Sequence, residues 1–526
     1  VIIVTGSVSR DVGGVIIPDT PKAKGVLTQD LIERQNPGQT ILDTINTLPG
    51  VNFQSNDAYG SSGGTLNIRG FNSQRVSLTL DGVPLNDSGG YDIYSNQMID
   101  PELIEQVNVN LGTTDVDSPT ASATGGTVAF RARKPSEEAG GLFVGSLGEH
   151  KYRRLFGLVE TGSIGPWGTR AWVAGSLTDY DKFRGPGELE KRQFNAQIQQ
   201  DIGDAGDFIS VGLHWNRNRN AFYRNASAAS FRQFGYGYDN LSVCARDAAT
   251  AGVADNDNAT PVGSTPALPS GDNIANTSSC SNYYGVRINP SDTGNLRISS
   301  LWHIGDNLRF TFDPSIQYTL ANGGGSTVVR ETPQAADADR RVVGATALAG
   351  FALNGDGDLL DQVRVYTPNN TNTRRYGLTS SLIWDVNDTN RVRFAYTLDY
   401  GKHRQTAAWG YLDAAGNPET VFAGRQGTKV ATADGSYLRG LDRYSVASMN
   451  QLSAEWRGQF VDDRLVATVG VRAPQFKREL NQYCYTPNGG TGNSGAVTSG
   501  GVLCTTQPVV ATLPNGNVRF GGSTLE

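Results

Sequence analysis

The sequence predicts a transmembrane antiparallel β-barrel that follows a smaller α+β domain. From about residue 141 onward, apolar and polar residues alternate in runs of about ten to thirteen residues. Very short and very long connections join these runs in turn, and no stretch of the chain approaches the apolar length that a spanning helix needs. A closed barrel is the remaining way to cross lipid, because it leaves no backbone group unpaired.

The alternation is clearest in residues 307–320 and 390–400. One face of the first run holds Leu308, Phe310, Phe312, Pro314, Ile316, Tyr318 and Leu320, and the other holds Arg309, Thr311, Asp313, Ser315, Gln317 and Thr319. The second run sets Val392, Phe394, Tyr396, Leu398 and Tyr400 against Arg391, Arg393, Thr397 and Asp399. A membrane strand requires this period of two, because one face meets hydrocarbon and the other the lumen. Strands of soluble sandwiches also alternate, so the prediction depends on the whole series.

Eleven strands are predicted in this series. They cover residues 141–147, 151–163, 168–180, 191–202, 207–217, 293–304, 307–320, 374–386, 390–402, 447–459 and 464–474. Short turns are expected at 165–168, 203–207, 305–307, 387–390 and 461–464, and long loops at 218–292, 321–373, 403–446 and from 475 onward. Short turns at one end and long loops at the other are typical of outer-membrane barrels, whose turns are periplasmic.

The predicted strand number is odd, and the sequence stops inside what reads as an outward loop. A bacterial single-chain barrel normally has an even number of strands, so that the first and last can pair. We therefore expect the sequence to be incomplete at its C-terminus, with about as many strands again in the finished barrel. The start at Val1 lacks the basic and apolar regions of a signal peptide, so we expect a processed or trimmed chain.

Composition excludes several classes of function. The net charge is −6 and the charges are scattered, which argues against a nucleic-acid partner. We find no nucleophile and base in a recognisable context and no cysteine–histidine spacing of a zinc site, so neither an enzyme nor a metal centre of that kind is predicted.

The four cysteines form two local pairs inside loops rich in Gly, Ser, Asn and Thr. We predict the disulfides Cys244–Cys280 and Cys484–Cys504 in an oxidising compartment. The alternative is four free thiols in unrelated loops.

The region before the barrel has a mixed pattern. Helices are expected at 27–34 and 40–48, and strands at 66–69, 76–80, 104–110 and 126–132. The chain is accordingly divided into an extended start at 1–15, a folded domain at 16–138 and the barrel at 139–526.

Five motifs of this first region occur in a specific order. They are Ile2–Gly6 (IIVTG), Asn67–Phe71 (NIRGF), Leu80–Asp87 (LDGVPLND), Ile104–Val109 (IEQVNV) and Ala123–Val128 (ATGGTV). In this order, ahead of a barrel-like series, they resemble the TonB box and plug domain of the TonB-dependent outer-membrane receptors. Any one of the glycine motifs alone would be an ordinary tight turn.

The resemblance implies a barrel of the 22-stranded class with the plug inside its lumen, of which about 11 strands are present here. It also implies a location in the bacterial outer membrane and contact with the lipid bilayer and lipopolysaccharide. The implied partners are a small-molecule nutrient and TonB with its inner-membrane energising complex, and no cofactor is implied.

Two further roles follow from the resemblance. The segment Ile2, Ile3, Val4, Thr5 and Gly6 is expected to bind TonB, since an extended apolar segment suits strand addition to an exposed sheet edge. Arg69 is a candidate for a buried plug–barrel ion pair, with its carboxylate partners expected in the missing part of the barrel. A second plug arginine, common in the family, is absent here, because the corresponding stretch reads Asn110–Thr113 (NLGT).

Ligand contacts are predicted in plug segments expected to face outward and in the first long loop. The plug candidates are Asn56, Asp57, Tyr59, Gln74, Arg75, Tyr91 and Tyr94, and the loop candidates are Arg217, Arg219, Tyr223 and Arg224. An Arg and Tyr cluster favours an anionic ferric chelate, since guanidinium groups bind carboxylates bidentately. The alternative is a solvated loop whose aromatic residues pack on neighbouring loops.

Two smaller features complete the expectations. Asp356, Asp358 and Asp361 resemble a calcium loop only in their alternating oxygen donors, and an acidic turn is the preferred interpretation. Trp215, Trp302, Trp384 and Trp456 fall on apolar strand faces and are expected to face lipid or its interface.

The predicted function is TonB-dependent import of a scarce nutrient, with a ferric siderophore or other iron chelate preferred. Import of a carbohydrate or of a cobalamin-like metal complex is the alternative within transport. A ligand-sensing surface receptor is the alternative outside it. The plug argues against a passive porin.

Overall fold

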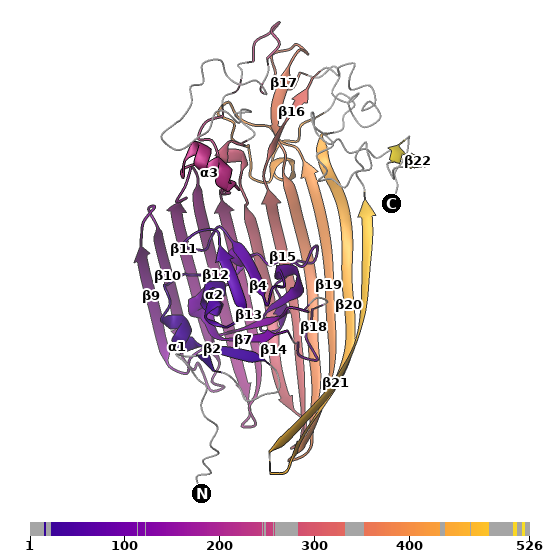
Figure 1. Cartoon of the computed structure of the whole chain (residues 1–526). Coiled ribbons are helices and arrows are strands. Elements are labelled where there is room, and N and C mark those ends of the chain that lie inside the picture. The colour runs from indigo at the N-terminus through magenta and orange to yellow at the C-terminus, as the bar shows by residue number, and fades with distance from the viewer. Residues whose placement is uncertain are drawn as a thin grey trace.

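A curved antiparallel sheet forms the wall of the molecule, and a smaller domain lies against one of its faces (Figure 1). The computed structural model describes residues 15–16, 23–112, 114–120, 123–244, 246, 249–255, 257, 282–331, 352–431, 437–462, 464–482, 509–512 and 518–520. Within these ranges, no helix is both long enough and apolar enough to cross a membrane.

The wall contains 11 strands in simple sequential order, which confirms the predicted antiparallel series. The strands are β9 (Ala139–Leu147), β10 (Arg153–Thr161), β11 (Arg170–Asp181), β12 (Glu188–Ile202), β13 (Asp207–Asn220), β14 (Ser291–His303), β15 (Leu308–Gly323), β18 (Asn369–Asn387), β19 (Asn390–Ala408), β20 (Arg439–Phe460) and β21 (Leu465–Gln482). Short turns join the strands at one end, and long loops join them at the other (Figure 1).

Strands β18 to β21 extend further toward the long-loop end than the alternation predicted. Strand β20 begins at Arg439 instead of 447, and β21 continues to Gln482 instead of 474. At 3.3 Å per residue, the 22 residues of β20 span roughly 70 Å, which exceeds a hydrocarbon core of about 30 Å even with strong tilt. Beyond the lipid, neither strand face has to be apolar, so backbone pairing continues after the apolar alternation has stopped.

The two faces of the wall differ as a membrane strand requires. Ile316 and Phe394 on the outer face are each 52% exposed, whereas Ser315 and Thr397 on the inner face are buried. Trp215 and Trp384 also lie on the outer face and are exposed. Such a continuous exposed apolar surface is explained by contact with lipid.

The smaller domain, called the plug below, is built on a mixed sheet of six strands ordered β1-β2-β7-β8-β5-β6. Its strands are β1 (Val15–Ile16), β2 (Lys24–Thr28), β5 (Val76–Leu80), β6 (Val83–Pro84), β7 (Ile104–Leu111) and β8 (Gly126–Ala132), with β3 (Val51–Ser55) and β4 (Gly64–Ile68) as a separate hairpin. The helices are short, α1 (Gln29–Glu33) and α2 (Ile41–Thr44). The helix expected from residue 27 starts later because Lys24–Thr28 pairs with β7.

A buried apolar core unites the plug with the first strands of the wall. Leu27, Ile41, Leu42, Ile45 and Phe130 are almost fully buried within the plug. Phe156 of β10 and Trp172 of β11 belong to the same cluster. The plug is therefore packed on this side of the wall by apolar contacts as well as by polar ones.

The long loops have cores of their own beyond the wall. The hairpin of β16 (Ser326–Arg330) and β17 (Gln362–Tyr366) contributes Val363 and Val365 to a cluster that also holds Trp409. The loops further contain α3 (Ala228–Phe234), β22 (Val509–Thr512) and β23 (Val518–Phe520). The described segments between the wall strands at the long-loop end, these elements included, are called the loop cap below.

One predicted disulfide falls partly in the loop cap. Cys244 is buried and disulfide-bonded. Cys280, Cys484 and Cys504 lie outside the described residues, so both predicted pairings stay predictions.

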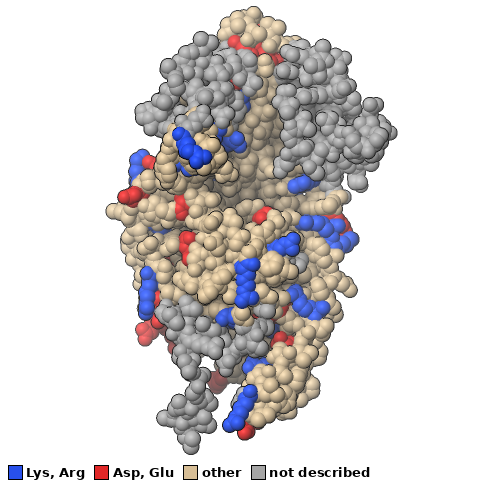
Figure 2. All heavy atoms as spheres, in the orientation of Figure 1, with Lys and Arg blue, Asp and Glu red and all other residues tan. Residues whose placement is uncertain are grey.

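Charged side chains are distributed over the molecule without forming one field. On the face drawn in Figure 2, basic and acidic residues are interspersed over the plug and the wall. Electrostatic interactions therefore have to be sought in local pairs.

The orientation of the wall can be tested at two neighbouring positions. Phe312→Lys places a charge on the lipid face and is expected to lower the free energy of unfolding by about 2–4 kcal/mol near the bilayer centre. Thr311→Lys, one residue earlier, points toward the plug beside Asp313, and its cost is expected to stay below about 1 kcal/mol. Denaturant unfolding in lipid vesicles measures both, and equal losses would contradict the assignment of faces.

Candidate functional site

Plug carboxylates pair with arginines of the wall. Arg154 of β10 is buried and donates to Glu102 at 2.8 and 3.0 Å, and it lies 3.3 Å from Asp100. Arg297 of β14 donates to Asp81 at 2.6 Å, and Arg393 of β19 pairs with Asp117. Three strands that are well separated in the wall thus each contact a different part of the plug through a charged pair.

In these pairs the arginine belongs to the wall and the carboxylate to the plug, whereas the predicted pair had the arginine, Arg69, on the plug. Arg69 of the plug is exposed, and it forms no ion pair with any residue that the structure describes. Its role as a lock residue stays a prediction. The reversed pairs were not foreseen because an inward arginine on a strand looks like any other polar position of the alternation.

Hydrogen bonds to main-chain oxygens of the plug supplement the charged pairs. Arg375 of β18 is held by Asp399 at 2.6 and 2.7 Å and donates to the backbone oxygen of Asn86 at 2.5 Å. Asn218 and Asn220 of β13 donate to the backbone oxygens of Asn96 and Ser61. The wall therefore also binds the plug through main-chain groups that carry no net charge.

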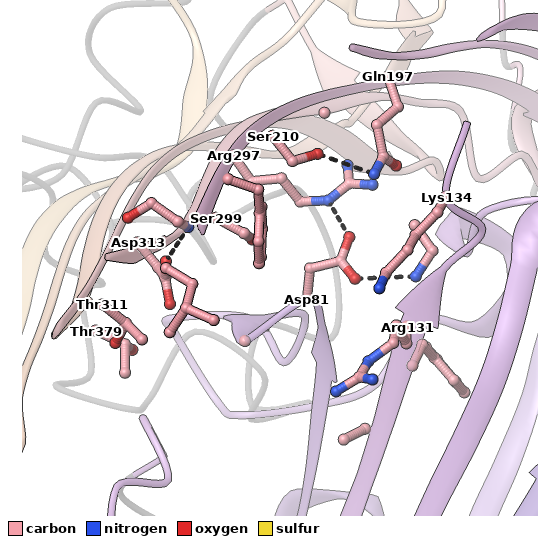
Figure 3. A pocket seen from close by; sticks show the side chains of 18 of the residues that line it. Asp81, Arg131, Lys134, Gln197, Ser210, Arg297, Ser299, Thr311, Asp313 and Thr379 are labelled. Atoms are coloured by element: carbon pink, nitrogen blue, oxygen red, sulfur yellow. Dashed lines mark hydrogen bonds and ion pairs between the residues drawn. The ribbon is translucent and has the colours of Figure 1, made fainter. Parts of the chain in front are cut away.

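A cavity of about 480 Å³, here called the short-turn cavity, lies between the plug and the wall near the short turns. The ion pair between Asp81 and Arg297 crosses it, and Figure 3 shows both side chains directed toward each other. Plug residues Arg131 and Lys134 line one side, and Asp313 of β15 lines another. Asp81 also accepts from the backbone N–H of Ala132 at 2.9 Å, so this carboxylate joins two plug strands and the wall.

A second pocket, of about 560 Å³, lies on the opposite, long-loop side of the plug and is called the long-loop pocket. It is lined by plug residues 87–94 and by the upper parts of β19, β20 and β21. The lining residues are Asp87, Gly89, Gly90, Asp92, Tyr94, His403, Gln405, Arg443, Tyr444, Ser445, Arg478 and Leu480. It is therefore located on the long-loop side of the plug.

The plug segment at this pocket is a tightly bonded turn. The Asp87 carboxylate accepts from the backbone N–H groups of Gly90 at 2.6 Å and Tyr91 at 2.7 Å. Gly89 lies so close to the wall that an added Cβ would be 2.8 Å from the imidazole of His403. Only glycine fits this position without displacing the ring.

Two guanidinium groups give the long-loop pocket its chemical character. Arg478 donates to the backbone oxygens of Ser88, at 2.5 Å, and Gly89, and Arg443 donates to the Gln405 amide. Each guanidinium has five N–H donors, so donors remain for a ligand. Burial raises the pKa of the Tyr94 phenol, with Asp87 and Asp92 adding to the shift, so this group stays a neutral hydrogen-bond donor.

Three of the predicted ligand residues gather at or beside this pocket. Tyr94 lines it, Tyr91 lies 5.7 Å below the Arg478 guanidinium, and Gln74 donates to Asp92 at 3.1 Å. Arg75 is exposed nearby in the chain. For these four residues, ligand binding stays a prediction.

Another three predicted residues lie elsewhere, against β10 and β11. Tyr59 stacks on Tyr152 with ring centroids 3.9 Å apart. Buried Asp57 accepts from the hydroxyl of Tyr180 at 2.9 Å, and burial raises the pKa of its carboxyl. Asn56 is exposed and donates to the backbone oxygen of Ser62. These side chains already have partners within the protein, which anchor a plug loop to the wall.

The loop candidates are divided between two places. Arg217 and Arg219 lie on the outer face of β13, away from the plug, because the alternation continues past Trp215 and turns Asn218 and Asn220 inward. Arg219 pairs with Asp292 at 2.9 Å, and ligand binding by Arg217 and Arg219 stays a prediction.

Tyr223 and Arg224 belong to the loop cap. The hydroxyl of Tyr223 accepts from the N–H of Phe183, and Arg224 lies 4.6 Å above the ring of Tyr238. Their predicted ligand contacts remain untested.

The remaining predictions concern TonB and calcium. Ile2, Ile3, Val4, Thr5 and Gly6 lie outside the described residues. In the loop cap, Asp361 lies close to Asp356 and Asp255 on one side and to Asp358 and Glu331 on the other, within a spacing that suits a cation. Calcium binding there stays a prediction.

His403, Arg443 and Arg478 are the pocket residues that the sequence did not reveal. Each was expected in a long loop, because the predicted strands ended before residue 403, began after 443 and ended before 478. An arginine at an inward-facing strand position would have indicated a pocket residue. This position can be recognised only when the strand bounds are known.

The charged plug contact can be tested at adjacent residues. Arg154→Met leaves Asp100 and Glu102 buried without a cation, and we expect a loss of about 3–5 kcal/mol in the stability of the docked plug. Arg153→Met removes an exposed outer-face pair with Asp179 and is expected to cost less than about 1 kcal/mol. Limited proteolysis of the plug in denaturant measures both, and similar sensitivity of the two variants would argue against the Arg154 contact.

Comparisons with known proteins agree with this geometry. Residues 17–127 match the family described as "TonB-dependent Receptor Plug Domain". No curated protein matches the sequence.

Among solved structures, the ferric-catecholate import receptor Fiu of E. coli K12 in its closed form is similar, with a TM-score of 0.56, 15% identity and coverage of 93% of this chain and 60% of that one. The pyoverdine outer membrane receptor FpvA of Pseudomonas aeruginosa PAO1 has a TM-score of 0.57, 14% identity and coverage of 90% and 62%. The chain thus spans about three fifths of the length of these receptors. Residues 17–127 therefore match a TonB-dependent receptor plug domain, and the chain as a whole shares the fold of these outer-membrane receptors, a plug packed against part of a barrel.

Proposed function

We propose that the protein imports a ferric siderophore or another iron chelate across the bacterial outer membrane. TonB and its inner-membrane energising complex supply the energy. The observation that best supports this proposal is the long-loop pocket. In it, Arg443 and Arg478 of the wall face the plug segment 87–94.

The charge of the pocket supports an anionic chelate. Iron chelates with carboxylate or catecholate groups present oxygen atoms that carry negative charge. Arg443 and Arg478 offer guanidinium donors that match such oxygens in geometry and charge. The phenol groups of Tyr94 and Tyr444 add neutral contacts, and a pocket of about 560 Å³ falls in the usual range for small-molecule sites.

The names of the similar structures support the same class of ligand. Fiu is described as a ferric-catecholate import receptor, and FpvA as a pyoverdine receptor. A sugar or a cobalamin-like complex is less well matched, because neither requires two adjacent cations. A ligand sensor that moves no ligand is the other alternative, and measured uptake separates it from an importer.

Binding of the chelate can be tested on strands β20 and β21. Arg443→Gln and Arg478→Gln each remove one charged hydrogen-bonding group and are expected to weaken binding of an anionic ferric chelate by roughly tenfold to a hundredfold. Lys477→Gln, next to Arg478 but on the outer face, is the matched control and is expected to bind normally. Cells that carry each variant are tested with radioactive iron bound to catecholate and carboxylate chelators.

Unchanged binding in both arginine variants would exclude the long-loop pocket as the chelate site. Strong binding of an uncharged oligosaccharide that survives both substitutions would favour the carbohydrate alternative. Binding without uptake in the unaltered protein would favour the sensor.

Energy coupling can be tested at the start of the chain. Ile3→Pro removes a main-chain donor from the segment proposed to add as a strand to TonB, so uptake is expected to fall to background while surface binding stays intact. An Ile3→Val variant, which keeps the donor, is expected to transport normally. Normal uptake by the proline variant would count against a TonB-binding role for Ile2–Gly6.

A further inference from the structure

Two cations lie directly opposite each other on the outer face of the wall. Arg374 of β18 and Lys402 of β19 are register partners, and both side chains are exposed. Like charges opposite each other on neighbouring strands repel and destabilise the pairing. Neither side chain has an acidic partner among the residues that the structure describes. The repulsion is therefore not relieved within the protein.

Several other outward cations near this end of the wall are matched by a carboxylate. Arg153 pairs with Asp179 at 2.6 Å, Arg219 with Asp292 at 2.9 Å, and Lys477 with Glu479. Arg404, two residues beyond Lys402, pairs with Asp442. The Arg374–Lys402 pair differs from these pairs. The residue opposite Arg374 on β15 and the residue opposite Lys402 on β20 are both uncharged.

The level of this pair along the strands is given by the residues below it. Tyr376 and Tyr400 are register partners two residues closer to the short turns, and Tyr318 of β15 is the partner of Arg374. Ile316 and Phe394, further down, are exposed apolar residues of the lipid face. An apolar band, then tyrosines, then cations is the order found at a membrane interface.

The cations therefore lie at the height of lipid headgroups. Two residues of a strand advance about 7 Å, so Arg374 stands roughly that distance beyond Tyr376. Because the long loops are at this end, the headgroups are those of the outward leaflet. The chemical group that is both anionic and present at this height is the lipid phosphate.

We propose that Arg374 and Lys402 bind a phosphate group of an outer-leaflet glycolipid. The Arg374 guanidinium can donate two parallel hydrogen bonds to phosphate oxygens, and the Lys402 ammonium supplies a compact second charge. The phosphate between them replaces the repulsion by two attractions. Tyr318 and Tyr400 present hydroxyl groups at the adjoining level of the interface. This site is independent of the nutrient that the long-loop pocket takes.

The test measures lipid binding to the purified protein in detergent by native mass spectrometry. The probes are a diphosphorylated, multiply acylated glucosamine disaccharide and the same lipid after removal of its phosphates. Arg374→Gln combined with Lys402→Gln is expected to weaken binding of the phosphorylated probe by about tenfold or more, from roughly fivefold for each basic residue. Binding of the dephosphorylated probe is expected to be weak and unchanged. Arg153→Gln and Lys477→Gln are matched outer-face controls that should bind the phosphorylated probe normally.

A single substitution separates lipid binding from stability. Lys402→Glu places a carboxylate opposite Arg374, so it should remove the repulsion and raise the thermal stability of the protein in lipid-free detergent. The same substitution should abolish binding of the phosphorylated probe. A structural role alone would predict no loss of lipid from a variant that is more stable.

Three outcomes would overturn the proposal. The first is unchanged binding of the phosphorylated probe in the double Gln variant and in Lys402→Glu. The second is an equal loss for the dephosphorylated probe, which would show that acyl chains are recognised instead. The third is full displacement of the glycolipid by millimolar inorganic phosphate, which would assign the site to a free anion.

Discussion

The docking of the plug depends on charged pairs that bridge it to the wall. Arg154, with a side chain that is 1% exposed, meets Asp100 and Glu102, and Arg297 meets Asp81. Removing either partner from such a buried pair is costly, whereas the intact pair contributes little net stability because both charges lose water. The contact therefore enforces a defined position of the plug without binding it irreversibly. Under the proposed import function, this combination suits a domain that closes the barrel and is displaced during transport.

A short plug segment connects the two cavities. Residue Asp81 is part of the short-turn cavity, and Asp87 is part of the long-loop pocket six residues further along the chain. Between them, the backbone oxygen of Asn86 accepts from Arg375, which Asp399 holds in place. A ligand that shifts the turn at Gly89 and Gly90 acts on a segment whose other end is bonded to Arg297. The geometry thus links the ligand side of the plug to its inner side through a few covalently connected residues.

The sequence predicted the wall well because its pattern has a direct physical cause. Lipid on one side and plug on the other impose a period of two, and all 11 wall strands were found from it. The same reasoning could not find the upper halves of β20 and β21, since beyond the lipid nothing forces either face to be apolar. For that reason Arg443 and Arg478 were assigned to loops. Their place in the pocket follows from register, which depends on pairing between strands and not on local composition.

For the plug, the sequence predicted strands but not the partners of individual side chains. Its strands at 76–80 and 126–132 were predicted with the right bounds, because each is a short apolar run between turns. The sequence could not show that the plug supplies the carboxylates of its ion pairs with the wall. The residues around Asp81 or Asp117 give no indication of an arginine partner far away in the chain. Tyr59 and Asp57 were expected to meet a ligand because they are polar and aromatic residues of a loop. The structure shows that such residues can equally anchor that loop.

The loop cap has an interior of its own, with Val363, Val365 and Trp409 packed away from the lipid-facing wall. Folding of the loop cap and insertion of the wall therefore depend on different sets of residues. Substitutions on the exterior of the cap therefore leave the lipid-facing positions of the strands unchanged. The cap can accordingly change in sequence without altering the residues on which assembly in a bilayer depends.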